Sequence, residues 1–92
     1  LIGDATIVEA SLSTRVPRLD LLPATQDLSG AEVELVDLER RTHRLADALE
    51  NVPPGRWDIC LVDCPPSLGL LTVNALVSAR HLLVPLQCEF FA

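Results

Sequence analysis

The chain of 92 residues contains neither methionine nor lysine. The missing methionine predicts that the chain is an internal piece of a longer polypeptide. The missing lysine excludes a complete phosphate-binding P-loop within it, because that loop uses a lysine to reach the β- and γ-phosphates. No apolar run approaches the ~20 residues needed to span a bilayer, so we expect no membrane contact.

Positive charge is also scarce. Seven arginines face thirteen acidic residues, which gives a formal net charge of −6. A nucleic-acid surface needs clustered lysine or arginine, so the composition argues against such a surface in this segment. The one basic cluster, Arg40, Arg41 and Arg44, is interrupted by acidic residues and therefore indicates a solvated helix face.

Cysteines are few and poorly spaced for metal binding. Cys60 and Cys64 are separated by three residues, Cys88 stands far along the chain, and no histidine lies close to the pair. This spacing does not match a zinc site, and it fits reduced thiols in a cytosolic protein. An apolar content of 49% in 92 residues is enough for the core of one small domain.

Helical and strand patterns alternate along the chain. Apolar runs bounded by turn residues predict strands at 19–23, 58–63 and 81–86, and 3.6-residue periodicity predicts helices at 1–12, 29–50 and 67–79. The run 58–63 is apolar on both faces, as is typical of a central parallel strand. The alternation predicts an α/β chain with a partial parallel sheet and flanking helices, an incomplete domain.

The predicted helix 29–50 begins with a capping-box spacing, Ser29 followed by Glu32. Its polar face carries opposite charges at i,i+4 spacing. These pairs are Asp37 with Arg41 and Glu39 with His43. Asn51 and the Pro53–Pro54–Gly55 turn are expected to end the helix.

Asp63 is the first polar residue at the carboxyl end of the central predicted strand. Ligands of open parallel sheets bind beyond these strand ends, where a carboxylate can hold Mg²⁺ directly or through water. Taken alone, this pattern is a weak signal, and a solvated strand-end carboxylate is the plainer interpretation. The next residues, Cys64-Pro65-Pro66, form a stiff turn because each proline fixes φ and removes a donor.

Three segments together resemble the ParA/Soj family of partitioning ATPases. Residues 58–76 read DICLVDCPPSLGLLTVNAL and are similar to the switch II segment of that family. Residues 19–35 resemble the stretch before it, and residues 84–92, VPLQCEFFA, resemble the stretch after it. The resemblance covers nearly the whole chain in the family's order. It implies a single ATPase domain with a P-loop NTPase-like, Rossmann-like three-layer fold in the deviant-Walker branch that includes MinD.

The resemblance also implies site residues. Asp63 matches the family's Walker B-like acid, which holds the Mg²⁺ shell through water. Cys64, Pro65 and Pro66 match the loop that responds to the γ-phosphate. Glu89 matches an acid that reaches the nucleotide across a dimer. Asn74 also matches the family pattern, and we assign it to helix packing rather than to ligand contact.

The implied whole protein binds Mg-ATP, forms a homodimer around it, binds DNA non-specifically and hydrolyses ATP with a ParB-like partner in the cytoplasm, on the nucleoid. The P-loop lysines, the catalytic acid and the DNA-binding residues would lie outside this chain, so we expect the chain alone to be inactive. Two alternatives remain: a non-catalytic, degenerate P-loop-like adaptor and a MinD-like positioning ATPase. The Cys64-Pro65-Pro66 turn favours ParA over MinD.

A few other residues invite functional readings that we do not adopt. Trp57 is expected to pack over the entry of the central strand rather than to stack on a base. His43 and His81 have no partner at catalytic spacing. Ser67 lacks a nucleophile motif and is assigned to helix capping, and Gln87 is assigned to strand-end hydrogen bonding.

Overall fold

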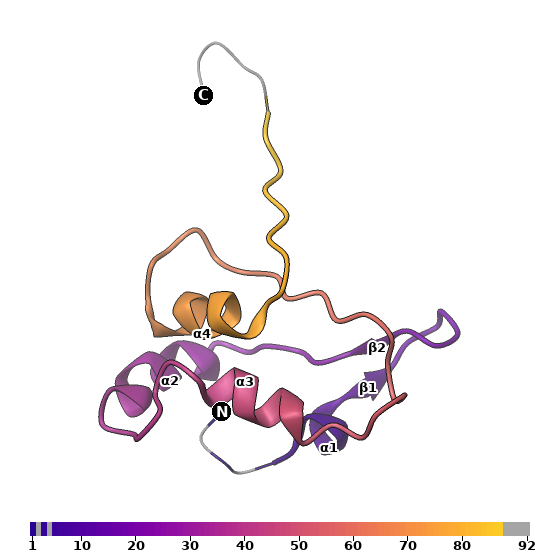
Figure 1. Ribbon diagram of the computed structural model, residues 1–92, viewed down its shortest axis with the longest axis horizontal. Coiled ribbons are helices and arrows are strands. Elements are labelled where there is room, and N and C mark those ends of the chain that lie inside the picture. The colour runs from indigo at the N-terminus through magenta and orange to yellow at the C-terminus, as the bar shows by residue number, and fades with distance from the viewer. Residues whose placement is uncertain (2, 4, 88–92) are drawn as a thin grey trace.

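A computed structural model describes residues 1, 3 and 5–87 of the chain. The elements are four helices and a two-stranded sheet, arranged as Figure 1 shows. They are α1 (Ile7–Ala10), β1 (Leu12–Ser13), β2 (Asp20–Leu21), α2 (Asp27–Val36), α3 (Arg44–Glu50) and α4 (Leu70–Ser78). This mixture of helices and a small sheet is compatible with a partial α/β fold.

The core lies where α4 packs on α2 and α3. Leu35 of α2 is fully buried, and Ala31 and Ala75 are buried beside it. Two polar residues of α4, Thr72 and Asn74, share this core. The helix α4 agrees with the predicted helix 67–79, although it begins at Leu70, so Ser67 is not its N-cap.

The N-terminal part is shorter and less buried than predicted. In place of a helix over 1–12, α1 spans one turn and is closed by a capping box between Thr6 and Glu9. The predicted buried strand 19–23 is reduced to β2, which pairs antiparallel with β1. Leu21 remains 55% exposed, because no layer covers the hairpin.

The single helix predicted over 29–50 is wrong. The chain leaves the helix after Val36 and re-enters one at Arg44, and Arg40 in the connection adopts a left-handed φ of 55°. Such a residue cannot continue a right-handed helix. The i,i+4 pairs expected on that helix therefore do not form. Ser29 lies within α2 instead of capping it, and its hydroxyl donates to the carbonyl of the N-cap residue Gln26.

The parallel sheet is not observed among the described residues. Residues 58–63 and 81–86 form neither helix nor strand, and none of them makes a backbone–backbone hydrogen bond with another described residue. A central strand exists only when neighbours on both sides accept and donate its ladder bonds. The sole paired strands in the described part are those of the antiparallel hairpin, so these two runs stay unpaired.

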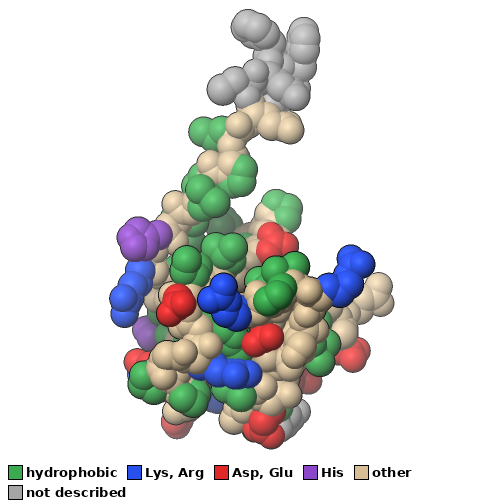
Figure 2. All heavy atoms as spheres, turned by 90° about the vertical axis from the view of Figure 1, so that its right-hand side faces the viewer, with side chains coloured by type: hydrophobic (Ala, Val, Ile, Leu, Met, Phe, Trp, Pro, Cys, Tyr) green, Lys and Arg blue, Asp and Glu red, His purple; other side chains and the backbone are tan. Residues whose placement is uncertain are grey.

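The molecule exposes far more surface than its mass requires. Its accessible surface is 8182 Å², whereas a compact monomer of this mass exposes about 5,200 Å². The Cα radius of gyration is 14.7 Å, against about 12 Å for a compact chain of this length. The extended segment leading to the C-terminal end stands away from the helices and carries hydrophobic side chains (Figures 1 and 2).

None of the helices in the described part of the chain is long and apolar enough to cross a membrane.

Candidate functional site

Asp63 lies at the end of the extended run that follows Trp57. Its carboxylate is exposed, and it forms no ion pair with another described residue. Residues 1, 3 and 5–87 contain no cluster of three potential metal ligands. At this point in the described part of the chain, the side chain that could hold a cation is the Asp63 carboxylate. This fits Mg²⁺, an ion commonly held by one or two carboxylates together with water and phosphate oxygens.

The loop from Cys64 to Gly69 joins Asp63 to α4. The Cys64 thiol donates to the carbonyl of Val62 at 3.7 Å, and the Ser67 N–H donates to the carbonyl of Pro65 at 2.8 Å. The second bond closes a tight turn centred on Pro66. The rings of both prolines fix their φ angles. The loop is solvent-exposed from Cys64 to Leu68, so its tip is free to meet a ligand.

The far end of this loop is held by Glu32 of α2. Its carboxylate accepts the N–H of Leu70 at 2.7 Å and the N–H of Leu71 at 3.1 Å. These are orphan donors of the first turn of α4, and the N-cap residue Gly69 has no side chain to satisfy them. The sequence pattern had assigned Glu32 to a local cap. The sequence does contain one indication of the distant contact. Gly69 has no side chain that could cap α4, so another residue has to accept these N–H groups.

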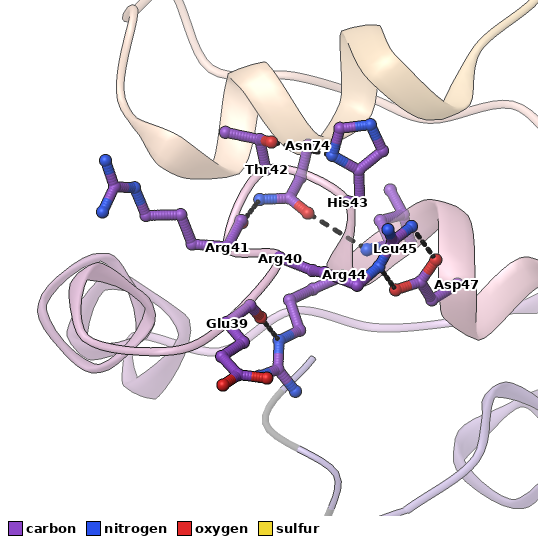
Figure 3. Close-up of polar contacts among 9 residues, drawn as sticks. All are labelled: Glu39, Arg40, Arg41, Thr42, His43, Arg44, Leu45, Asp47 and Asn74. Carbon is purple, nitrogen blue, oxygen red and sulfur yellow. Dashed lines mark hydrogen bonds and ion pairs between the residues drawn. The ribbon is translucent and has the colours of Figure 1, made fainter.

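Asn74 secures the same helix one turn further on. Its side-chain oxygen accepts the N–H of Leu45 at 3.0 Å, and its amide nitrogen donates to the carbonyls of Arg41 and Leu70 at 2.7 and 2.8 Å. Figure 3 shows the amide pointing from α4 into the connection between α2 and α3. Asn74 is fully buried. Its predicted assignment to helix packing is confirmed.

The basic cluster surrounds this contact without forming a positive patch. Arg40 donates two hydrogen bonds to Asp47, at 2.7 and 2.8 Å, and Arg44 donates to the carbonyl of Glu39. The Arg40 hydrogen bonds hold the pKa of Asp47 below its usual value, and the same pair raises the pKa of Arg40. The arginines are thus used mainly within the fold, as Figure 3 illustrates.

Trp57 anchors the start of the extended run. Its indole N–H donates to the Asp20 carboxylate of β2 at 2.8 Å, and the Arg56 guanidinium lies 4.9 Å above the ring centroid. The residue thus lies at the entry of the run 58–63, held by a hydrogen bond rather than by a covering layer.

Two further residues singled out from the sequence come at the C-terminal end of the chain. Glu89 lies outside the described residues, and Gln87 is exposed at their end. Two hollows in the described part have volumes of about 250 and 330 Å³. Neither of them is lined by Asp63 or by its loop.

Comparison with known proteins identifies the family. A family model described as an AAA domain matches residues 1–92. The chain is 53% identical over 93 residues to "Chromosome partitioning protein ParA" of Caulobacter vibrioides (strain NA1000 / CB15N), covering 100% of the chain and 35% of that protein. The chain belongs to the ParA/Soj family of AAA domains. The resemblance stated from the sequence motifs is confirmed.

Two further relatives of this ParA/Soj-family chain carry the name Soj. "Sporulation initiation inhibitor protein Soj" of Bacillus subtilis (strain 168) is 47% identical over 92 residues, covering 100% of the chain and 36% of that protein. "Chromosome-partitioning ATPase Soj" of Treponema pallidum (strain Nichols) is 48% identical, with the same coverage. The chain spans about a third of the length of these relatives. No solved structure matches it significantly.

Proposed function

We propose that this chain is the central segment of a ParA-type ATPase that binds Mg-ATP, dimerises and partitions chromosomes or plasmids. Membership of the ParA/Soj family along the whole chain carries the proposal. The exposed Asp63 with its stiff loop, held at the far end by α2, supports it. The names of the relatives, ParA and Soj, favour ParA over a MinD-like positioning protein.

In this proposal Asp63 holds the Mg²⁺ shell through a water molecule. Cys64, Pro65 and Pro66 form the loop that responds to the γ-phosphate, and Glu89 reaches the nucleotide from one subunit to the other. Bound Mg²⁺ would neutralise charge on the β- and γ-phosphates. The residues of this chain orient the metal-bound water and register the phosphate. The lysine that grips the phosphates comes from another part of the protein, because this chain contains none.

We further propose that residues 58–63 and 81–86 become strands of a parallel sheet in the longer protein. Leu61 and Leu83 are 88% and 85% exposed. Such apolar runs are strands without partners, and parallel strands are normally covered on both faces. Docked against neighbouring strands, the run 58–63 would bring Asp63 to a carboxyl edge of the sheet, where ligands of α/β domains bind.

Non-specific DNA binding and stimulation by a ParB-like protein are assigned to other parts of the protein. The net charge of −6 in this segment opposes contact with DNA phosphates. The protein would act in the cytoplasm on the nucleoid. The chain alone would be inactive, and its lack of lysine also keeps open the second candidate, a non-catalytic adaptor.

Substitution of Asp63 in the full-length protein tests the proposal. Asp63→Asn keeps the shape of the side chain and removes its charge, so Mg²⁺-dependent ATP hydrolysis should fall about 10–100-fold. Asp58→Asn, at an exposed acid five residues earlier, should leave the rate near wild type. Full hydrolysis by the Asp63→Asn protein would refute the assigned role. A wild-type protein that neither binds nor hydrolyses Mg-ATP would favour the adaptor.

Titration of the 92-residue chain with Mg-ATP tests the proposal that the chain alone is inactive. We expect no saturable binding, because the lysine and the backbone amides of a P-loop are absent from the sequence. Tight binding by this chain would show that the phosphate-binding groups lie within it, contrary to the proposal.

A further inference from the structure

We propose that Glu32 is a positioning residue for the loop Cys64–Gly69, whose C-terminal end it fixes. The two bonds from its carboxylate to the N–H groups of Leu70 and Leu71 span 38 and 39 residues of sequence. A charged acceptor at a helix N-terminus gains from both charge-assisted hydrogen bonding and the helix dipole. The contact therefore joins α2 directly to the end of the loop.

Gly69 is matched to this carboxylate. A Cβ built on Gly69 would lie 2.5 Å from Glu32 Oε1 and 2.7 Å from Oε2. Real side chains do not approach this closely, so any residue larger than glycine would push the carboxylate off the helix. The backbone of Gly69 has a φ of −72° and a ψ of 178°, which other residues adopt freely. Glycine thus leaves room for the Glu32 carboxylate in its observed position, and its backbone angles are not the reason for a glycine here.

Asn74 makes the attachment of α4 rigid. It binds the connection before α3 from a position one turn beyond Leu70, so α4 is tied at two points to two different elements. Movement of the loop is then confined to residues 64–68, with Gly69 as its fixed end. The two prolines further restrict the positions that this short stretch can adopt.

The consequence for nucleotide binding rests on the proposed function. If the loop senses the γ-phosphate, its resting position depends on the Glu32 contact. A loop released at Gly69 would adopt many positions, and the protein would lose part of its preference for ATP over ADP. Contacts to the rest of the nucleotide would be unaffected, so affinity for ADP should stay the same.

The first experiment measures the coupling between Glu32 and Gly69 in the full-length protein. Unfolding by urea is followed for Glu32→Ala, Gly69→Ala and the double variant. Each single substitution should lower the midpoint, and the double variant should lie close to the lower single one, because both remove the same contact. Amide exchange at Leu70 and Leu71 should rise about tenfold or more in all three variants. Additive effects with unchanged exchange at these two amides would overturn the proposal.

The second experiment measures the affinities for Mg-ATP and Mg-ADP by direct titration. Glu32→Ala should lower the ATP/ADP affinity ratio about fivefold or more. Glu32→Gln should lower the ATP/ADP affinity ratio less, because the amide oxygen still accepts one of the two N–H groups. Its NH₂ group cannot accept the other, so part of the effect remains. Glu34→Ala, at an exposed acid on the same helix, should leave the ratio unchanged.

The two experiments separate the possible failures. Glu32→Ala and Gly69→Ala could have non-additive effects on unfolding while Glu32→Ala leaves the ATP/ADP affinity ratio at the wild-type value. Glu32 would then act only as a helix cap, and its positioning role would be overturned. If the wild-type protein bound no Mg-ATP, the proposed function would fail, while the cycle would still decide whether Glu32 holds the loop.

Discussion

A single side chain, Asn74, joins the helix that follows the loop to the connection before α3. It is fully buried and uses both ends of its amide, so its three hydrogen bonds replace those that water would make. Removing it would leave the Leu45 N–H and the Arg41 carbonyl without partners. Each such orphaned group costs about 1–3 kcal/mol.

We therefore expect Asn74→Ala to lower the free energy of unfolding by about 2–4 kcal/mol. Urea denaturation followed by circular dichroism measures this change. Asn51→Ala, at the exposed C-cap of α3, is the matched control and should stay within about 0.5 kcal/mol of wild type. An Asn74→Ala chain as stable as this control would contradict the account.

The ion pair of Arg40 and Asp47 predicts a pH dependence. The pKa of Asp47 is lowered in the folded chain by the hydrogen bonds from Arg40. A lowered folded pKa means that the carboxylate stabilises the fold above its unfolded pKa of about 3.9. This contribution disappears as the pH falls through the folded pKa.

Unfolding free energies measured from about pH 7 to about pH 3 test this sign. The wild-type chain should be more stable than Asp47→Asn at neutral pH, and the difference should shrink in acid. Arg40→Gln, which removes the other partner of the pair, should show the same convergence. A difference that grew as the pH fell would contradict the assignment.

At the scale of elements, α2 contains a glycine that its surroundings do not require. A Cβ on Gly30 would meet nothing within 4 Å, whereas Gly55 has a φ of +81° that disfavours any other residue. Glycine inside a helix costs about 0.5–1 kcal/mol relative to alanine. The two positions therefore respond to the same substitution with opposite signs.

Gly30→Ala should raise the free energy of unfolding by about 0.5–1 kcal/mol, and Gly55→Ala should lower it by about 1 kcal/mol. Thermal unfolding of the two variants beside wild type gives both values. Destabilisation by Gly30→Ala would show that this face of α2 is packed more tightly than the described contacts indicate.

The sequence predicted elements well where the information is local. The apolar spacing along residues 67–79 placed α4 to within a few residues. The residues that carry this spacing are Leu70, Leu71, Val73, Leu76 and Val77. The break between α2 and α3 was missed because it depends on Asn74, a residue about thirty positions away. The remote cap from Glu32 was missed for the same reason, since its acid lies 38 residues before the N–H that it satisfies.

The candidate site was predicted from motifs rather than from geometry. Asp63 and the Cys64-Pro65-Pro66 turn were found because they resemble the ParA/Soj pattern, and the family assignment is confirmed. Their assigned roles remain predictions. The strands that were predicted to position Asp63 are unpaired in the described part of the chain. A strand forms only beside a neighbouring strand that hydrogen-bonds to it, and the periodicity of one segment does not show whether such a neighbour is present.

At the scale of the whole molecule, exposed apolar runs dominate. Ile59, Leu61, Leu82 and Leu83 are each more than two-thirds exposed. Unpaired extended runs with apolar side chains are templates for strand pairing between molecules. The chain in isolation should therefore self-associate.

Sedimentation velocity of the 92-residue chain at increasing concentration tests this expectation. The wild-type chain should form larger species as the concentration rises. Leu61→Lys with Leu83→Lys should reduce association, because charge on an unpaired run opposes pairing. Val33→Lys, at a similarly exposed apolar residue on α2, should not. A wild-type chain that stays monomeric would contradict the prediction.

The one tryptophan of the chain is an intrinsic fluorescent probe. Trp57 is hydrogen-bonded to Asp20 and lies under Arg56, where the run 58–63 begins. Because the chain has no other tryptophan, all indole emission comes from this point. A covering layer over that run would exclude water from the ring and move its emission to shorter wavelength. Fluorescence from this residue can thus report, without any added label, whether the segment that ends at Asp63 has found its neighbours.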